Sequence, residues 1–308
     1  MKGHVQTPSE VAERMVNLLF EDKPPSEGDR ILYPGCGSEG PFIAAVSSYC
    51  ESRNLSIPEG VAFETHPERF REVSERHGDQ PVDFRNSDFL KQDAGLGRFD
   101  FVISNPPYVP IEEIEKKSEY KKYFKTAQER FDLYILFFEQ ALNLLADGGR
   151  LSFITPEKFE YTQTTAKLRE LLTARHLDRI EHLEETTFSG YITYPAITVV
   201  SETEPGSTKV VRRDNSSEVI DLPRDGRSWA PIIRNVDHEL METGISLEDI
   251  TERISVGVAT GRDKIFVQPE DEIPPQLLED DWTYPTVSGK QLELHDGPHG
   301  KDHLICPY

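Results

Sequence analysis

An apolar run at residues 99–104 leads directly into Asn105-Pro106-Pro107-Tyr108. A short β-forming run that stops at two prolines indicates a buried strand, because proline cannot continue a sheet ladder. In α/β folds, ligands bind at the carboxyl ends of such strands. The Asn105 side-chain oxygen and the Pro106 carbonyl are neighbouring acceptors, and Tyr108 offers a stacking surface beside them. This combination suits a planar group with an exocyclic amine; an ordinary turn is the alternative.

Short strands alternate with helical segments over the first two hundred residues. This alternation predicts an α/β fold with a doubly wound, mostly parallel sheet. Thr7, Pro8 and Glu10 match a helix start, with Thr7 as the cap and Glu10 completing a capping box. The predicted strands are 31–33, 60–64, 82–85, 99–104 and 151–154.

Beyond residue 200 the pattern changes. Residues 209–211 and 218–220 flank a polar tetrapeptide and predict a hairpin. The Pro-, Arg- and Asp-rich stretch 223–234 predicts a linker, and the remainder lacks strand–helix alternation. The expected organisation is a first domain at 1–203, a hairpin and linker at 204–245, and a partial second domain at 246–308.

Residues 35–40 fit a Gly-x-Gly-x-x-Gly turn between a strand and a helix. Glycines let the backbone approach a ligand and present amides at a helix start, but nicotinamide, flavin and S-adenosylmethionine enzymes all use such turns. Glu64 ends the next strand, where a carboxylate can accept bonds from ribose hydroxyls. Asp88 ends the third strand and can accept from an adenine amine, with Phe89 packing on its ring. A surface glutamate, a turn aspartate and a core phenylalanine are the plainer alternatives.

Length and composition set limits. The chain has 308 residues, of which 36% are hydrophobic, enough for one large core and a smaller unit. No apolar run reaches the ~18 residues that a membrane span needs, and the first residues contain no signal-peptide core. The cysteines, Cys36, Cys50 and Cys306, are odd in number and lack metal-ligand spacing. We expect no disulfide framework, no metal site, no membrane partner and a reducing cytoplasm.

Acidic residues number 55 against 34 basic ones, a net charge of −21. Alone, this argues against a nucleic-acid partner, which requires a basic surface. Two interpretations remain: an acidic enzyme with a small substrate, or a protein adapted to high salt that keeps basic residues only where they are needed. We favour the second because lysines gather just after the Asn-Pro-Pro-Tyr loop. They are Lys116, Lys117, Lys121, Lys122 and Lys125, followed by Arg130.

Taken together and in order, these motifs resemble those of gamma-type adenine-N6 DNA methyltransferases of restriction-modification systems. The resemblance covers residues 5–200 and continues into 257–266 and 284–289, which are similar to segments of that family's target-recognition region. The matching pieces are Thr7-Pro8 with Val11, Gly40-Pro41-Phe42, Glu64, Asp88-Phe89, Asn105 to Tyr108, Asp132-Leu133-Tyr134 with Phe137, and 148–154 with Pro156.

The resemblance implies a class I methyltransferase fold with S-adenosylmethionine as cofactor and double-stranded DNA as substrate. A restriction nuclease, or a further chain that completes target recognition, is a second expected partner. The implied catalytic residues are Asn105, Pro106, Pro107 and Tyr108. The implied cofactor-binding residues are Thr7, Pro8, Tyr33, Gly35, Cys36, Gly37, Gly40, Glu64, Asp88, Phe89 and Asn105.

Mechanistically, acceptors at Asn105 and Pro106 would localise the adenine amine's lone pair toward the methyl donor. The target base would be flipped out of the duplex onto Tyr108. Direct in-line transfer needs no covalent intermediate, so we interpret Cys36 as a small loop residue.

The chain departs from the family at three points. Tyr33 stands where many relatives have an acidic residue. The late aromatic that flanks the target base has no clear match, with Phe188, Tyr191 and Tyr194 as candidates. The chain also ends where relatives typically continue, which predicts a fragment truncated within the recognition region.

Other functions stay open. Guanine-N2 methyltransferases of ribosomal RNA and glutamine methyltransferases of release factors share Asn-Pro-Pro-Tyr, but lack the early Thr-Pro helix and the large following domain. A non-catalytic DNA-binding module of a restriction-modification assembly is a further alternative. A nicotinamide oxidoreductase leaves Asn105 to Tyr108 without a role.

Overall fold

The computed structural model describes residues 6–91, 94–114, 117–128, 130–188 and 194–234, together with 267–269, 272–273, 283–286 and 302–305. The chain divides into two compact units, Met1–His238 and Glu239–Tyr308. In the second unit, β10 (Val267–Pro269), β12 (Asp302–Ile305) and β11 (Thr283–Thr286) form an antiparallel sheet in that order. The segments 257–266 and 287–289, which we matched to a recognition region, lie outside the described residues.

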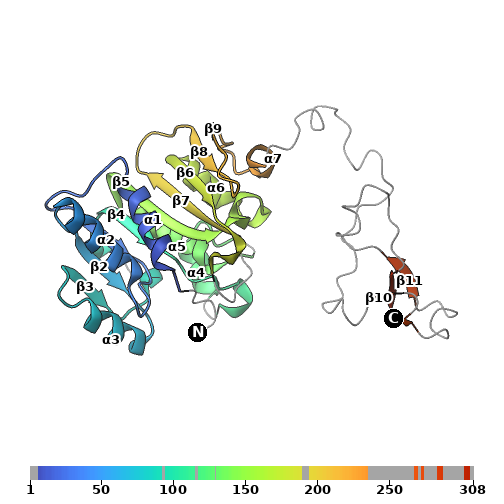
Figure 1. The fold of residues 1–308 in the computed structure, drawn as a ribbon, viewed down its shortest axis with the longest axis horizontal. Helices are drawn as coiled ribbons and strands as arrows, with labels where there is room; N and C mark the ends of the chain where they lie inside the picture. The colour runs from blue at the N-terminus through green and yellow to red at the C-terminus, as the bar shows by residue number, and fades with distance from the viewer. Residues whose placement is uncertain are drawn as a thin grey trace. The chain divides into compact units, whose positions relative to one another are not determined.

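The first unit is built on a nine-stranded sheet with the order β3-β2-β1-β4-β5-β7-β6-β8-β9 (Figure 1). Strands β1 to β5 pair in parallel, whereas β7 runs antiparallel to both neighbours. The predicted α/β class with a mostly parallel sheet is confirmed. The strands are β1 (Arg30–Tyr33), β2 (Glu59–Phe63), β3 (Val82–Arg85), β4 (Phe99–Ser104), β5 (Leu145–Pro156), β6 (His176–His182), β7 (Pro195–Ser201), β8 (Thr208–Val211) and β9 (Ser217–Ile220).

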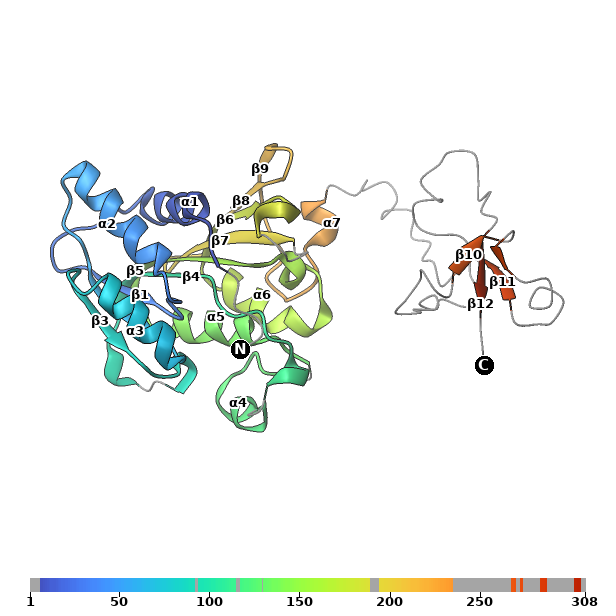
Figure 2. The same cartoon turned by 60° about the horizontal axis from the view of Figure 1, so that its bottom comes forward.

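Helices cover both faces of this sheet (Figure 2). One hydrophobic core holds side chains of α1 and α2, and the other holds those of α4, α5 and α6. The helices are α1 (Ser9–Phe20), α2 (Pro41–Arg53), α3 (Pro67–Arg76), α4 (Lys117–Tyr123), α5 (Leu133–Asn143), α6 (Ala166–Thr173) and α7 (Ala230–Ile233). Short 3-10 turns are η1 (Phe89–Lys91), η2 (Ala94–Leu96), η3 (Ile111–Glu113), η4 (Glu157–Glu160), η5 (Gln163–Thr165) and η6 (Glu185–Thr187).

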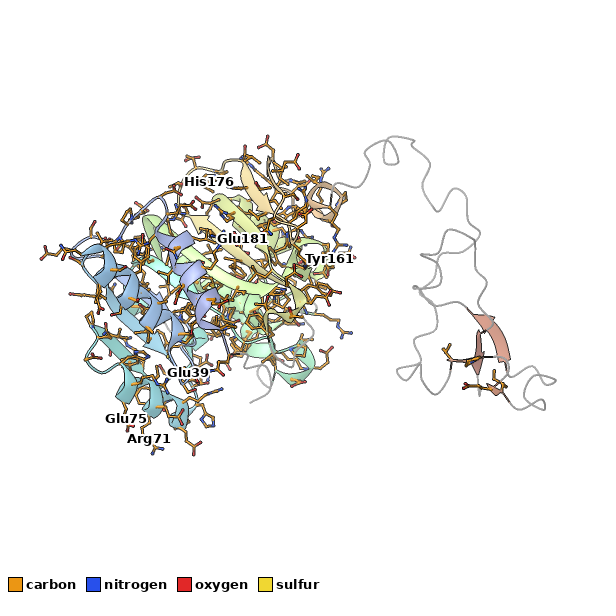
Figure 3. The ribbon with its side chains drawn as sticks, viewed as in Figure 1. Glu39, Arg71, Glu75, Tyr161, His176 and Glu181 are labelled. Carbon is orange, nitrogen blue, oxygen red and sulfur yellow. The ribbon has the colours of Figure 1, made fainter. Side chains whose placement is uncertain are left out.

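Successive side chains of β1 point to opposite faces of the sheet and so enter different cores. Leu32 belongs to the core on the α5 face, whereas Ile31 and Tyr33 belong to the core on the α1 face. An ion pair connects α1 to β6: the Arg14 guanidinium donates to both carboxylate oxygens of Glu181, at 2.9 Å each. Figure 3 labels Glu181 on this strand. None of the helices in the described ranges is both long and apolar enough to cross a membrane.

The stretch that we expected to be a hairpin and linker is part of the first unit. Strand β8 pairs in parallel with β6, and β9 continues the sheet as the second arm of the predicted hairpin. Residues 223–234 are packed rather than extended away, because Trp229 is fully buried with its ring 6.1 Å from that of Phe159. The first compact unit therefore extends to residue 238 and includes the stretch 204–234.

A buried guanidinium holds this segment in place. Arg169 of α6 donates to the Phe159 carbonyl at 2.7 Å and to the Gly226 carbonyl at 2.7 Å. It donates further to the carbonyls of Thr162 and Arg227 and to the Thr165 hydroxyl. Burial lowers the pKa of Arg169. The loop after β5 and the segment before α7 are thereby joined through one side chain.

Candidate active site

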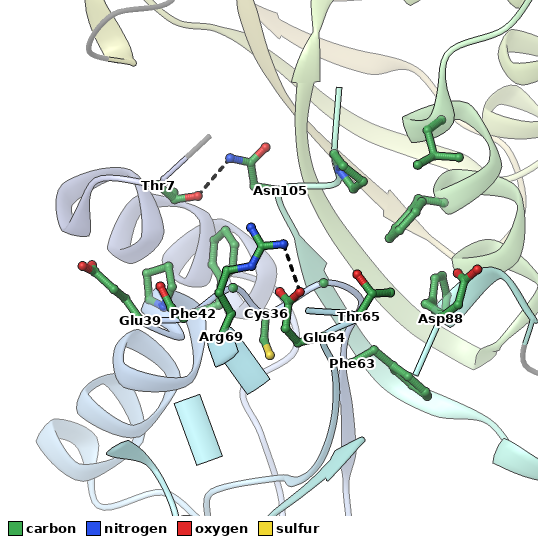
Figure 4. A pocket seen from close by; sticks show the side chains of 18 of the residues that line it. Thr7, Cys36, Glu39, Phe42, Phe63, Glu64, Thr65, Arg69, Asp88 and Asn105 are labelled. Atoms are coloured by element: carbon green, nitrogen blue, oxygen red, sulfur yellow. Dashed lines mark hydrogen bonds and ion pairs between the residues drawn. The ribbon is translucent and has the colours of Figure 1, made fainter. Parts of the chain in front are cut away.

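A cavity of about 230 Å³ lies at the carboxyl ends of β1, β2, β3 and β4 (Figure 4). Each of these strands contributes residues through the loop that follows it, as expected for a parallel sheet. Among the predicted cofactor-binding and catalytic residues, those that line the cavity are Thr7, Gly35, Cys36, Gly37, Glu64, Asp88, Phe89, Asn105 and Pro107.

The glycine loop turns sharply between β1 and α2. Gly35, Gly37 and Gly40 have φ values of +74°, +68° and +58°, a left-handed conformation that favours glycine. The Cys36 amide donates to the Phe63 carbonyl at 2.8 Å, which fixes the loop against β2. Gly40 does not line the cavity; a Cβ there would lie 2.9 Å from the His77 ring, so this glycine is required by close packing.

Glu64 follows β2 and is buried, with 5% of its surface exposed. Its Oε1 accepts from the His66 amide at 2.8 Å and lies 3.3 Å from Nη2 of Arg69. Figure 4 shows the Arg69 guanidinium reaching from α3 into the cavity toward this carboxylate. Both contacts engage the same oxygen, so Oε2 is the atom of Glu64 that a ligand could approach.

Asp88 lies at the other end of the cavity. Its Oδ1 accepts from the Leu90 amide at 3.1 Å, and Oδ2 accepts from the Tyr120 hydroxyl at 3.4 Å. Burial, and then the Asp88 carboxylate, raise the pKa of Tyr120, which keeps that hydroxyl a donor. The Phe89 ring lies 5.4 Å from that of Phe137 in the cavity wall.

Asn105 directly follows β4 and is held from two sides. Its Nδ2 donates to the Thr7 hydroxyl at 3.0 Å, which orients the side-chain amide with Oδ1 turned away from Thr7. The preceding Ser104 donates its hydroxyl to the Pro34 carbonyl, which ties the end of β4 to the start of the glycine loop. The expected Thr7 capping box does not form: α1 begins after Pro8 without a side-chain cap, and the Thr7 hydroxyl contacts Asn105 instead.

Other predicted site residues lie outside the cavity lining: Pro8, Tyr33, Gly40, Pro106 and Tyr108. The Tyr33 side chain is 2% exposed and packs in the core on the α1 face, where burial raises its pKa. Its position follows from β1 alternation, which turns Tyr33 away from the Leu32 face. Tyr108 donates its hydroxyl to the Ile154 carbonyl at 3.1 Å, and its ring meets Tyr134 edge-on at 6.4 Å.

Sequence reasoning missed Arg69 and Tyr120. Arg69 is the only cation among the described residues that line the cavity. It lies in the first turn of α3, a helix with three arginines, and nothing in the sequence distinguishes Arg69 from Arg71 and Arg76. Tyr120 is the one buried residue of a lysine-rich helix, a pattern that predicts packing but not what the ring packs against.

The structure separates the three candidate late aromatics. Phe188 is 2% exposed within the core, whereas Tyr194 is 44% exposed with the Arg213 guanidinium 5.0 Å from its ring centre. Tyr191 lies outside the described residues. Of the two candidates that the structure describes, Tyr194 is therefore the one with an accessible ring.

Cys36 has the properties of a packed thiol. It is 6% exposed, and burial, followed by the Glu64 charge, raises its pKa to about 12. A nucleophilic cysteine requires a lowered pKa, so the thiol of Cys36 is not activated. Within the described ranges, no group of three or more His, Cys, Asp or Glu side chains is arranged to hold a metal ion.

Comparison with known proteins gives this geometry a context. The Eco57I restriction-modification methylase family matches residues 43–188. The Type II methyltransferase M.PaeR7I of Pseudomonas aeruginosa is 27% identical over 365 aligned residues, which cover 100% of this chain and 63% of that protein. M.BstVI of Geobacillus stearothermophilus is 38% identical over 226 residues, covering 59% of the chain and 40% of the relative. The chain thus spans less than two thirds of these relatives.

Solved structures agree on the fold. A Listeria monocytogenes protein described as a class I S-adenosylmethionine-dependent methyltransferase has a TM-score of 0.58 at 16% identity, covering 77% of this chain and 71% of that one. The Type ISP restriction-modification enzyme LlaGI, with its nuclease deleted and in complex with a DNA substrate mimic, has a TM-score of 0.60 at 17% identity, covering 86% and 34%. The chain therefore has the class I S-adenosylmethionine-dependent methyltransferase fold, and its sequence is similar to restriction-modification methyltransferases.

Proposed function

We propose that this chain transfers a methyl group from S-adenosylmethionine to the N6 amine of adenine in double-stranded DNA, as a gamma-type enzyme of a restriction-modification system. The observation that carries the proposal is the position of Asn105. Its amide is oriented by Thr7 at 3.0 Å within the same cavity as Glu64 and Asp88. An acceptor for an exocyclic amine and two carboxylates suited to a nucleoside therefore share one site.

The cavity residues fit S-adenosylmethionine, which supplies an electrophilic methyl group on its sulfonium. Glu64 Oε2 would accept from the ribose hydroxyls and Asp88 from the adenine amine, while the Phe89 and Phe137 rings form an apolar wall. Arg69 lines the cavity with its side chain 19% exposed, and its Nη2 lies 3.3 Å from Glu64 Oε1. Its guanidinium could donate to an anionic group of a ligand, such as an amino-acid carboxylate.

The adenine amine is a weak nucleophile because its lone pair is delocalised into the ring. Asn105 Oδ1 and the Pro106 carbonyl would accept hydrogen bonds from its two N–H groups and localise that pair. The role of Asn105 is thus to position and polarise the amine, which requires a fixed amide orientation. The bond that Asn105 Nδ2 donates to the Thr7 hydroxyl supports that orientation.

Access to the amine requires the base to leave the duplex. Tyr108 follows the two prolines, and its hydroxyl bond to Ile154 and edge contact with Tyr134 set the plane of its ring. We assign Tyr108 as the stacking partner of the flipped base. Tyr194, exposed at the start of β7, is our candidate for the aromatic on the base's other side.

Target recognition would involve residues 246–308 together with a further chain or a restriction nuclease. The support is that relatives named as Type II methyltransferases are longer than the matched region. We also retain a cytoplasmic location and adaptation to high salt, on the basis of the −21 net charge.

The test is methyl transfer from labelled S-adenosylmethionine to a DNA library, with sequencing of the methylated adenines. Wild-type protein should yield N6-methyladenine. Asn105→Ala should abolish transfer while cofactor affinity changes by only a few-fold, because the oxygen that is removed acts on the target amine and Glu64 and Asp88 remain to hold the cofactor. Parallel arms contain ribosomal RNA and a release-factor peptide. Labelling of those substrates alone would favour the RNA or glutamine alternatives, and cofactor binding without transfer to any substrate would favour a non-catalytic module.

A further inference from the structure

Helix α4 presents two chemically different faces. Tyr120 is 8% exposed and forms part of the cavity wall, where its hydroxyl donates to Asp88. Lys117, Lys121 and Lys122 are exposed, and Tyr123 has 74% of its surface accessible. One short helix therefore contacts the cofactor cavity on one side and solvent on the other. Lys116 lies outside the described residues.

The helix is supported at its carboxyl end. The Phe124 amide donates to the Tyr120 carbonyl at 2.9 Å, and the two rings lie 6.0 Å apart. Beyond it, the buried Glu139 of α5 accepts from the Lys125 amide at 2.9 Å and from the amide and hydroxyl of Thr126 at 2.8 and 2.7 Å. The lysines are thus carried by an element that is bonded to the core.

The lysines of α4 differ from most of the other described lysines, although Lys209 on β8 also forms no ion pair with a described residue. Lysines at 23, 91, 158 and 167 each form an ion pair with a carboxylate. Lys117, Lys121 and Lys122 form no ion pair with another described residue. Glu119 is the one carboxylate on this helix, so the three lysines leave it with a net positive charge. In a chain of net charge −21, such a cluster is a surface that a polyanion can approach. Lysine ammonium groups bind the phosphates of a duplex, and an exposed tyrosine can contact its sugar–phosphate backbone.

We propose that α4 binds the phosphate backbone of duplex DNA and couples duplex binding to occupancy of the cofactor cavity. The proposal rests on the function proposed above. A ligand in the cavity contacts Tyr120 and Asp88, and a duplex contacts the lysines of the same helix. Because binding linkage is reciprocal, each ligand that holds α4 in this position should strengthen the binding of the other.

The first experiment measures binding of a fluorescent duplex by the 308-residue chain over a range of KCl concentrations. Lys121→Gln/Lys122→Gln should weaken binding about tenfold and flatten the plot of log affinity against log salt by about two, one per lost phosphate contact. The matched control, Lys167→Gln/Lys209→Gln, removes the same charge from α6 and β8 and should behave as wild type. Equal affinity and slope in both double variants would overturn the phosphate contact.

The second experiment repeats the titration with saturating S-adenosylhomocysteine. Wild-type protein should bind the duplex about fivefold more tightly or better, within the usual range of coupling energies. Tyr120→Phe keeps the lysines but loses the bond to Asp88, so most of this gain should disappear. Tyr123→Phe alters the exposed tyrosine of the same helix and should retain it. An undiminished gain in Tyr120→Phe would refute the coupling.

The methylation assay separates failure of this inference from failure of the proposed function. If wild-type protein methylates DNA and the lysine variants bind and methylate DNA as wild type does, the role of α4 is rejected. The proposed function is then retained. Absence of any DNA methylation, with α4-dependent binding of RNA in place of duplex, would reject both.

Discussion

The Thr7 hydroxyl lies 3.0 Å from the Asn105 amide nitrogen, although 98 residues separate them in the sequence. The segment before α1 therefore reaches the carboxyl end of β4 and orients the side chain that we assign to the target amine. Through this bond, the segment before α1 becomes part of the candidate active site.

Thr7→Val should lower the rate of methyl transfer about tenfold, because one neutral hydrogen bond that orients Asn105 is removed at nearly constant shape. The rate should be measured in single turnover at saturating S-adenosylmethionine, which compensates for any loss of cofactor affinity. Ser9→Ala, an exposed change two residues away, is the control. A Thr7→Val rate equal to that of Ser9→Ala would show that Asn105 does not depend on Thr7.

Glu64→Gln should raise the Kd for S-adenosylmethionine about tenfold or more, since hydrogen bonds to a charged acceptor contribute about 1.5–3 kcal/mol. Isothermal titration calorimetry measures the change. Glu68→Gln, an exposed residue of α3, makes the same charge change and should leave the Kd as it is. Unchanged affinity in Glu64→Gln would remove Glu64 from the cofactor site.

Arg169→Met should destabilise the first unit by about 3 kcal/mol or more, because carbonyls of Phe159 and Gly226 lose a charged donor inside the protein. Urea unfolding gives the free energy of unfolding directly. Arg224→Met is the matched control, since Arg224 is exposed and makes a single 3.5 Å bond to the Pro205 carbonyl. A loss of unfolding free energy no larger than in the control would show that the Arg169 bonds to Phe159 and Gly226 do not stabilise the first unit.

The pair of His182 and Glu160 predicts a pH dependence of stability. Burial lowers the pKa of His182, but Glu160, 2.8 Å from its Nε2, and Glu157 outweigh burial, and the net pKa is raised above 6.5. The folded state then binds this proton more tightly than the unfolded state. Its stabilisation is complete below pH 6.5 and is lost as the pH rises through the folded pKa.

The free energy of unfolding of wild type should accordingly decline as the pH rises above 6.5, and His182→Gln should lack this decline. Burial also raises the pKa of Glu160, which produces a decline of the same sign that starts at lower pH. His176→Gln is the control and should retain the wild-type profile. Parallel profiles for wild type and His182→Gln would exclude His182 as the source.

Added KCl should raise the thermal midpoint, because salt screens repulsion among carboxylates in a chain of net charge −21. The affinity for duplex DNA should fall as KCl is added, because salt weakens phosphate contacts. A scan from low to molar KCl, with sucrose at matched osmolality as the control, separates charge screening from solvent exclusion. A midpoint that falls with KCl would count against adaptation to high salt.

Local patterns were sufficient to predict much of the sheet and the cavity. The glycine loop, Glu64, Asp88 and Asn105 all end or follow short apolar strands, and parallel topology brings strand ends together without further information. The sequence did not predict that Tyr33 packs in the core on the α1 face and not against the cavity. Which face of β1 a side chain occupies depends on the register of the whole sheet.

Residues whose role depends on distant partners were not predictable. Thr7 fits a capping box by sequence, but its hydroxyl contacts a side chain from β4. The composition of 223–234 indicates a linker, and only the site next to Phe159 explains why Trp229 is buried. Arg69 and Tyr120 enter the cavity from helices whose sequences give no sign of a ligand.

The packing of β8, β9 and Trp229 determines where the first unit can be cut. A fragment ending at residue 203 would expose the β6 backbone from Arg179 to Glu181, where β8 now pairs, and an open edge of this kind is a template for aggregation. It would also leave the aromatic surface of Phe159 uncovered. The shortest stretch that keeps the cofactor cavity and covers this edge therefore extends through Arg234, 78 residues past Pro156, where the last strand with a matched motif, β5, ends.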